Sequence, residues 1–146
     1  YAQSDATYGT IDLNDALGKH KNACGYAAAV LVSEKGGPAE VRMSSKNAIE
    51  LFLNGKRVFA HEEYHHGNRF DQYRTTVALA PGENRLLVKV CQNDQKENWA
   101  QEWNIALRVC DATGGAVSLT QLVTKDGKRV EVAPGAIRPA AKKEEK

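Results

Sequence analysis

The sequence lacks the features that mark two large functional classes. No apolar run approaches the ~20 residues of a membrane helix, and the longest, Tyr26 to Val32, suits a buried strand. Neither sign of charge dominates, because the formal net charge is +2 and Lys and Arg are scattered among Asp and Glu. A basic stripe, the electrostatic mark of nucleic-acid binding, is absent. We therefore expect neither a membrane span nor a nucleic-acid partner.

Motifs of nucleophilic and phosphate chemistry are missing as well. The sequence has no G-x-S-x-G elbow and no Cys that a motif pairs with His. Its glycine pairs, at Gly36-Gly37 and Gly114-Gly115, lack the strand-to-helix context of a phosphate loop. Paired-carboxylate hydrolysis stays open, since acidic residues occur throughout the chain. These absences favour a protein that binds over an enzyme.

Cysteine is scarce, and Cys24, Cys91 and Cys110 cannot all pair within the chain. One disulfide plus one thiol agrees with this number, and so do three buried thiols that act as small hydrophobic residues. Cys91 and Cys110 would meet only if their strands were neighbours. The chain begins at Tyr1 and shows no signal peptide, which is typical of a processed protein, a trimmed chain or one domain of a larger protein.

What the sequence does contain is hydrophobic alternation with period two, the spacing of half-buried strands. The clearest segment surrounds Asn54-Gly55, a strong hairpin signal because both turn positions need positive φ. A two-residue turn there sets two pairs opposite each other on one core-facing side: Leu51 with Val58, and Ile49 with Ala60.

Similar segments, separated by turn residues, predict about eight short strands and no sustained helix. The 146 residues suffice for one domain and are too few for two. We therefore predict an all-β antiparallel β-sandwich over residues 1–133, followed by a disordered, Pro-, Ala- and charge-rich tail over residues 134–146. The other predicted strands are residues 11–17, 27–33, 40–43, 75–79, 86–90, 105–109, 117–122 and 130–132.

The long connections are predicted to share one end of this sandwich. If consecutive strands run antiparallel, residues 18–25, 61–72 and 92–103 fall together, opposite the tight turns. These three loops hold all four histidines and both tryptophans. Long loops on a rigid scaffold are where binding usually occurs, so this end is the predicted site.

The loop from Gln92 to Trp103 sets two Trp among amide and acid side chains, as in saccharide recognition. Indole faces stack on sugar C–H surfaces, while amides and carboxylates bond to hydroxyl groups. The alternative is that the Trp rings close the open end of the sandwich, above all Trp103, which leads into a strand. Tyr64, Phe70 and Tyr73 either complete the surface or pack beneath their loop. The predicted ligand-binding residues are Trp99, Trp103, Tyr64, His65, Asn93 and Asp94.

Two patterns raise the question of a metal. His61-Glu62-Glu63-Tyr64-His65 matches H-E-x-x-H, which binds zinc when a helix aligns both imidazoles and a third ligand joins them. Here it follows a strand, and the nearest downstream carboxylate, Glu83, lies at the other end. His61, His65 and His66 without a helix, or calcium on Asp94, Glu97 and Glu102, are weaker alternatives. We predict no metal or cofactor, since no EF-hand spacing supports calcium.

The segment from Ile49 to Val90 resembles the sugar-binding-type jelly-roll domain that accompanies glycoside hydrolase family 2 catalytic domains, and more broadly the galactose-binding-like fold. The resemblance rests on the Asn54-Gly55-Lys56 hairpin, the Phe70-Asp71 pair and Pro81-Gly82-Glu83-Asn84 before the next strand. It implies a jelly-roll sandwich and transfers no binding residues. Segments 91–95 and 108–111 also look like modules appended to large exported bacterial proteins, which implies a secreted or periplasmic location.

Three functions follow from these observations. The first is a non-catalytic carbohydrate-binding-like module, accessory to a larger exported protein. The second is an interaction or scaffold domain whose loops contact a neighbouring protein domain and no glycan. The third, and most remote, is a metal-dependent hydrolase that uses the His61–His65 loop.

Overall fold

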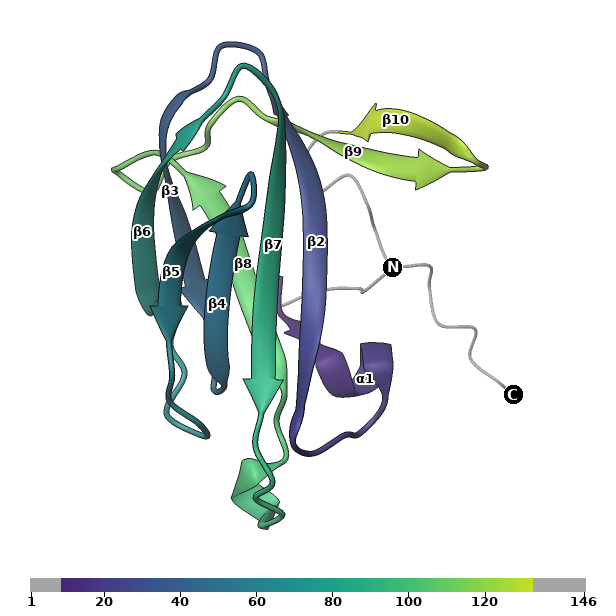
Figure 1. Ribbon diagram of the computed structural model, residues 1–146. Helices are drawn as coiled ribbons and strands as arrows, with labels where there is room; N and C mark the ends of the chain where they lie inside the picture. Colours follow the sequence, from purple (N-terminus) through teal and green to yellow (C-terminus); the bar gives the residue numbers. More distant parts are fainter. Residues whose placement is uncertain (1–8, 133–146) are drawn as a thin grey trace, which may run out of the picture.

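The computed structural model describes residues 9–132, which form a sandwich of two antiparallel sheets (Figure 1). One sheet has the strand order β1-β8-β3-β6, and the other has the order β10-β9-β2-β7-β4-β5. The predicted β-sandwich is confirmed, with ten strands in the described part of the chain. The elements are β1 (Ile11–Asp12), α1 (Leu13–Leu17), β2 (Ala23–Ser33), β3 (Gly37–Ser44), β4 (Ala48–Leu53), β5 (Lys56–His61), β6 (Tyr73–Leu79), β7 (Gly82–Gln92), η1 (Asn98–Ala100), β8 (Asn104–Cys110), β9 (Thr120–Lys125) and β10 (Lys128–Val132).

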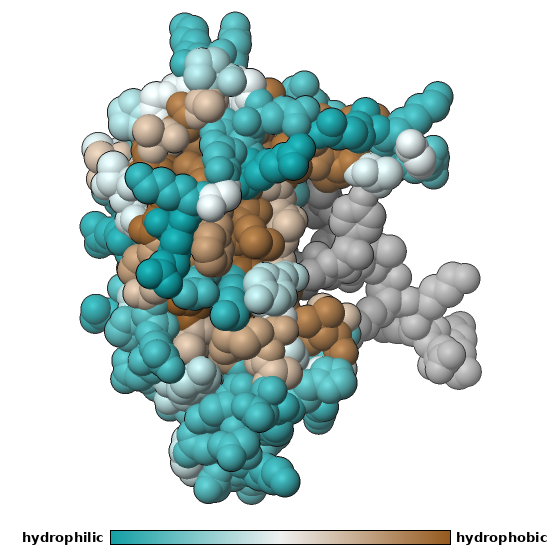
Figure 2. All heavy atoms as spheres, viewed as in Figure 1, coloured by the Kyte–Doolittle hydropathy of each residue, from teal (hydrophilic) through white to brown (hydrophobic). Residues whose placement is uncertain are grey.

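The core lies between the sheets and takes alternate residues from each strand. Val41 and Met43 of β3 and Ile105 of β8 face Leu51 of β4 and Val90 of β7, and all five are almost fully buried. Apolar side chains also gather over the middle of the outer face of the six-stranded sheet, with hydrophilic ones around them (Figure 2). The predicted tail, residues 134–146, lies outside the described residues.

The Asn54-Gly55 hairpin forms as predicted, with φ of 50° and 81° at its two turn residues. Its predicted register is wrong beyond the first two pairs. The strands shift by one residue between Leu51 and Phe52, so that Leu51 lies opposite Phe59 and Ile49 lies opposite His61. Such a β-bulge adds one residue to one strand and turns every later side chain to the other face. The shift therefore brings His61, in place of Ala60, opposite the core residue Ile49.

The predicted strand over residues 11–17 is also wrong after Asp12, where α1 begins. The Asp12 carboxylate accepts a hydrogen bond from the Asn14 N–H at 2.8 Å and so caps the helix. Gly18 ends it with φ of 89°. A single helical turn is too short to show a helical period in the sequence.

Cys24 of β2 and Cys91 of β7 are directly opposite in the sheet and form a disulfide, whereas Cys110 is a buried free thiol. Of the two arrangements that the cysteine count leaves open, the structure has one disulfide plus one thiol. Within residues 9–132, no helix is long and apolar enough to cross a membrane.

Candidate functional site

The three long connections meet at one end of the sandwich, the lower end in Figure 1, as strand parity predicts. The Asn22 N–H after α1 donates to the Asn93 carbonyl after β7 at 2.9 Å. The Lys21 ammonium donates to the carbonyl of Ala100 in the β7–β8 loop. The β5–β6 loop joins them through His65, whose Nε2 contacts Asn93 Oδ1 at 2.6 Å.

Four of the predicted ligand-binding residues form one surface group at this end. His65 lies edge-on to Trp99 with ring centroids 5.7 Å apart, and the Tyr64 and His65 centroids are 6.4 Å apart. Asn93 fixes the group, because its amide also donates to Gln95 Oε1 at 2.7 Å. Trp99 is 61% exposed, so its ring is free to stack on a ligand.

Trp103 does not belong to this group and packs in the core, which is the alternative that the sequence left open. Its ring is 2% exposed, and its Nε1–H donates to the Val90 carbonyl at 3.0 Å inside the core. A Cβ added to Gly25 would lie 3.0 Å from this indole, so β2 needs glycine where the ring packs. Asp94 lies exposed on the same loop and bonds to no described residue.

A second feature at this end is a shallow, largely open cleft of about 460 Å³, formed by the β5–β6 loop with the last residue of β5 and the first of β6. β5 and β6 are the edge strands of different sheets, and they meet where the Thr75 hydroxyl donates to the Val58 carbonyl at 3.0 Å. The cleft lies just beyond that contact. It is lined by His61, Glu63, Gly67, Asn68, Arg69, Gln72 and Tyr73.

The wall of the cleft is a network of rings with one carboxylate. The His61 ring lies 4.7 Å from the Tyr73 ring, centroid to centroid, and its Nε2 donates to Glu63 at 2.9 Å. That hydrogen bond lowers the pKa of Glu63, which is therefore an anion at neutral pH. The Tyr73 hydroxyl donates to His66 Nε2 at 3.3 Å, and burial raises the pKa of Tyr73. The wall is thus ordered without any ligand.

Two consecutive histidines of the β5–β6 loop contact the two regions, one the Trp99 surface and the other the cleft. His65, with φ of 54°, contacts Asn93 and Trp99, whereas His66 packs against Tyr73 and His61. The backbone N–H of His66 also donates to the Lys46 carbonyl at 3.3 Å, which ties the loop to the β3–β4 turn. One loop therefore shapes both the Trp99 surface and the cleft.

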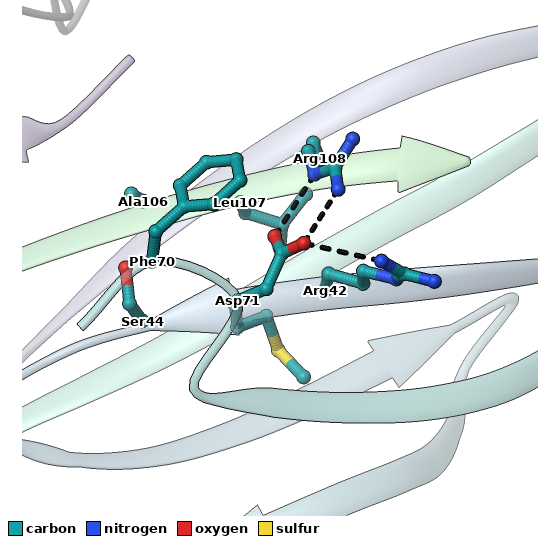
Figure 3. A pocket seen from close by; sticks show the side chains of 8 residues that line it. Arg42, Ser44, Phe70, Asp71, Ala106, Leu107 and Arg108 are labelled. Atoms are coloured by element: carbon teal, nitrogen blue, oxygen red, sulfur yellow. Dashed lines mark hydrogen bonds and ion pairs between the residues drawn. The ribbon is translucent and has the colours of Figure 1, made fainter. Parts of the chain in front are cut away.

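An ion cluster on the outer face of the four-stranded sheet fixes the other end of this loop (Figure 3). Arg42 of β3 and Arg108 of β8 lie directly opposite each other, and Asp71 reaches between them. Its carboxylate accepts from Arg108 Nε at 2.9 Å and from Arg42 Nη1 at 3.2 Å. The pKa of Asp71 is lowered, mainly by the bond from Arg108. The Phe70 ring covers Arg108, with the guanidinium carbon 5.0 Å from its centroid.

The space inside this cluster is about 20 Å³, enough for a water molecule and too small for a sugar. We therefore regard Asp71 as the anchor of the loop and not as a ligand-binding residue. The sequence signals it only through the Phe70-Asp71 pair that leads into the next strand.

The geometry does not support the zinc interpretation of residues 61–65. His61 ends a strand and His65 lies in coil, so the helix that would align their imidazoles is absent, and they contact different partners. Glu83 pairs instead with Arg129, and Glu102 with Lys46 at 2.6 Å. In the described part of the chain, no three His, Cys, Asp or Glu side chains converge as ligands of one metal ion.

The sequence predicts the site at this end and within residues 61–72, but it assigns few residues of the cleft individually. Tyr73 is predicted either to complete the binding surface or to pack beneath its loop, and His61 appears only in the metal patterns. Asn68, Arg69 and Gln72 are not singled out. Their one signal is that they lie in a long loop between two predicted strands. Comparison with protein-family models, curated proteins and solved structures finds no match for this chain. The site must therefore be interpreted from its own geometry.

Proposed function

We propose that this chain is a non-catalytic carbohydrate-binding-like module whose ligand occupies the cleft between β5 and β6. The observation that carries the proposal is the cleft itself, an open space of about 460 Å³ walled by rings and planar polar groups. Its volume lies within the roughly 300–1,000 Å³ that small-molecule sites occupy. It is formed by long loops on a rigid β-scaffold, where binding sites usually lie.

The lining residues match the chemistry of a sugar ring. The adjacent rings of His61 and Tyr73 offer a surface for C–H groups. Asn68 and Arg69 are exposed and present hydrogen-bond donors and acceptors at the mouth. Glu63 accepts hydrogen bonds as a carboxylate. Nothing in the arrangement pairs a nucleophile with a base, so the proposal is for binding alone.

The Trp99 surface extends the same proposal. An exposed indole beside His65 and Asn93, at the same end of the sandwich, would stack on a second sugar of a longer chain. Tyr64, held next to His65, widens that platform.

The compartment and family context are part of the proposal. A disulfide supports an oxidising compartment, in line with a secreted or periplasmic protein. The sandwich of two antiparallel sheets is consistent with the resemblance to galactose-binding-like accessory domains. Such a module would position a larger exported protein on its glycan.

A glycan array, followed by affinity gels with and without chelator, tests the function. We expect binding that a chelator leaves unchanged and that His61→Ala weakens, because this change removes one wall of the cleft. His20→Ala is the matched control, since His20 is exposed on the α1–β2 loop and outside the cleft. If no glycan of the array binds, or if both variants lose binding equally, the proposal is contradicted and the interaction-domain alternative is favoured.

A further inference from the structure

The cleft has one acidic and one basic side chain, and only the acidic one has a partner among the described residues. Glu63 and Arg69 are the acidic and the basic residue of its lining that carry formal charge at neutral pH. The Glu63 carboxylate already accepts a hydrogen bond from His61 at 2.9 Å. The Gln72 amide is committed too, because it donates to the Gly67 carbonyl at 2.7 Å. These contacts leave the cation of the cleft without a local counter-charge.

Within residues 9–132, the Arg69 guanidinium makes no ion pair and no hydrogen bond. The nearest carboxylate in the sequence, Asp71, is held by Arg108 and Arg42 on the outer face of the four-stranded sheet. Its side chain is only 12% exposed and cannot reach back to Arg69 without breaking those bonds. Of the three acids of the β5–β6 loop, Glu63 and Asp71 are engaged, and Glu62 does not line the cleft and makes no ion pair with Arg69. Arg69 therefore presents five unused N–H donors at the cleft.

A guanidinium distinguishes carboxylates from neutral hydroxyl groups. Its planar fork matches a carboxylate with two parallel hydrogen bonds, whereas a neutral hydroxyl fills only part of it. The exposed amide of Asn68 lies next to it in the lining and serves the neighbouring hydroxyl groups. The ring wall of His61 and Tyr73 faces the same space.

We propose that the saccharide bound in this cleft is a uronate, a sugar ring with a carboxylate, and that Arg69 selects it through a bidentate ion pair. This inference rests on the proposed carbohydrate-binding function and narrows it to one substrate class. The sugar ring packs on the His61 and Tyr73 side, and the carboxylate points to Arg69.

The test compares charged and neutral forms of the same polymers. Polygalacturonate and alginate are run in affinity gels beside the same polymers after chemical reduction of their carboxylates to primary alcohols. The unmodified chain should bind at least one acidic polymer about tenfold or more tightly than its reduced form, as a charge-assisted hydrogen bond implies. Arg69→Gln should abolish that preference.

Arg74→Gln is the matched control. Arg74 is an exposed arginine on β6, outside the cleft, and makes no ion pair with the described residues, so its loss changes net charge equally. It should keep the preference for the acidic polymer. Equal loss in both variants would show unspecific charge attraction and overturn the inference.

The two proposals fail in different ways. Binding of neutral glycans that is as tight as that of the acidic polymers, and unchanged in Arg69→Gln, overturns the uronate inference and leaves carbohydrate binding intact. Absence of binding to these polymers and to every glycan of the array removes both proposals. Thermal unfolding of each variant shows whether the fold is retained.

Discussion

The Cys24–Cys91 disulfide should contribute strongly to the free energy of unfolding of the sandwich. It closes a segment with a sequence separation of 67, which includes β3 to β6 and most of β2 and β7. Cross-linking restricts the unfolded chain, and the chain-entropy relation gives about 4.4 kcal/mol at 25 °C for a closure of that length. For a domain of this size, such a loss lowers the melting temperature by roughly 15 °C.

The assay is urea unfolding of the oxidised chain, of the reduced chain and of the Cys24→Ala/Cys91→Ala double variant. Cys24 is exposed and Cys91 half-buried, so the alanines remove little packing. We expect the reduced chain and the double variant to unfold at the same urea concentration, which should be lower than that of the oxidised chain. The urea dependence of the unfolding free energy should also rise, because an uncrosslinked chain exposes more surface on unfolding.

Addition of reductant to the double variant is the control and should change nothing, since Cys110 has no partner to lose. A stability difference below about 1 kcal/mol would refute the reasoning, because removal of a native disulfide from a small domain typically costs about 2–5 kcal/mol. Such a small difference would mean that the unfolded chain keeps β2 and β7 paired even without the disulfide that links them.

Two further predictions concern single side chains. Trp99→Ala should weaken glycan binding and leave the melting temperature nearly unchanged, because the ring is 61% exposed; a large stability loss without a binding change would place it in the core instead. For Asp71, bonds from Arg108 and Arg42 lower the carboxyl pKa, so its stabilisation is complete above the unfolded value of about 3.9 and is lost as pH falls through the folded pKa. In Asp71→Asn, the urea midpoint of unfolding should therefore fall less steeply as the pH is lowered than it does in the unmodified chain. Parallel plots of urea midpoint against pH for the two proteins would contradict this.

The fold could be predicted because its strands alternate and its turns carry strong local signals. Asn54-Gly55 and Pro81-Gly82 adopt the expected turns, and counting reversals between them brings the long loops to one end. These are local properties, which depend on residues close in the sequence. The resemblance to galactose-binding-like domains stays a prediction.

The register after the hairpin could not be predicted, because the bulge depends on partners from other strands. Val58 and Phe59 both pack against the core, and only the folded sheet shows that there is room for two consecutive side chains. The choice between core and ligand binding for Trp103 depends on long-range packing for the same reason. The space that it fills is created by Gly25, which is distant in the sequence.

The lining of the cleft could not be assigned residue by residue, because it joins residues whose alignment depends on that bulge. His61 faces Tyr73 only because the strand gained a residue before it. The role of Arg69 likewise depends on where Asp71 is held, and no spacing in the sequence shows that Asp71 turns away toward Arg42 and Arg108.

The position of the cleft at the end of β5 and the start of β6 has a consequence for stability. β5 and β6 follow each other in the chain but belong to different layers, so a molecule seated between them touches both layers at once. Any ligand that binds only the folded chain stabilises it, by an amount that grows with ligand concentration relative to its Kd. Because the ligand would contact both layers, it would oppose their separation, and an occupied module would unfold at a higher temperature than an empty one.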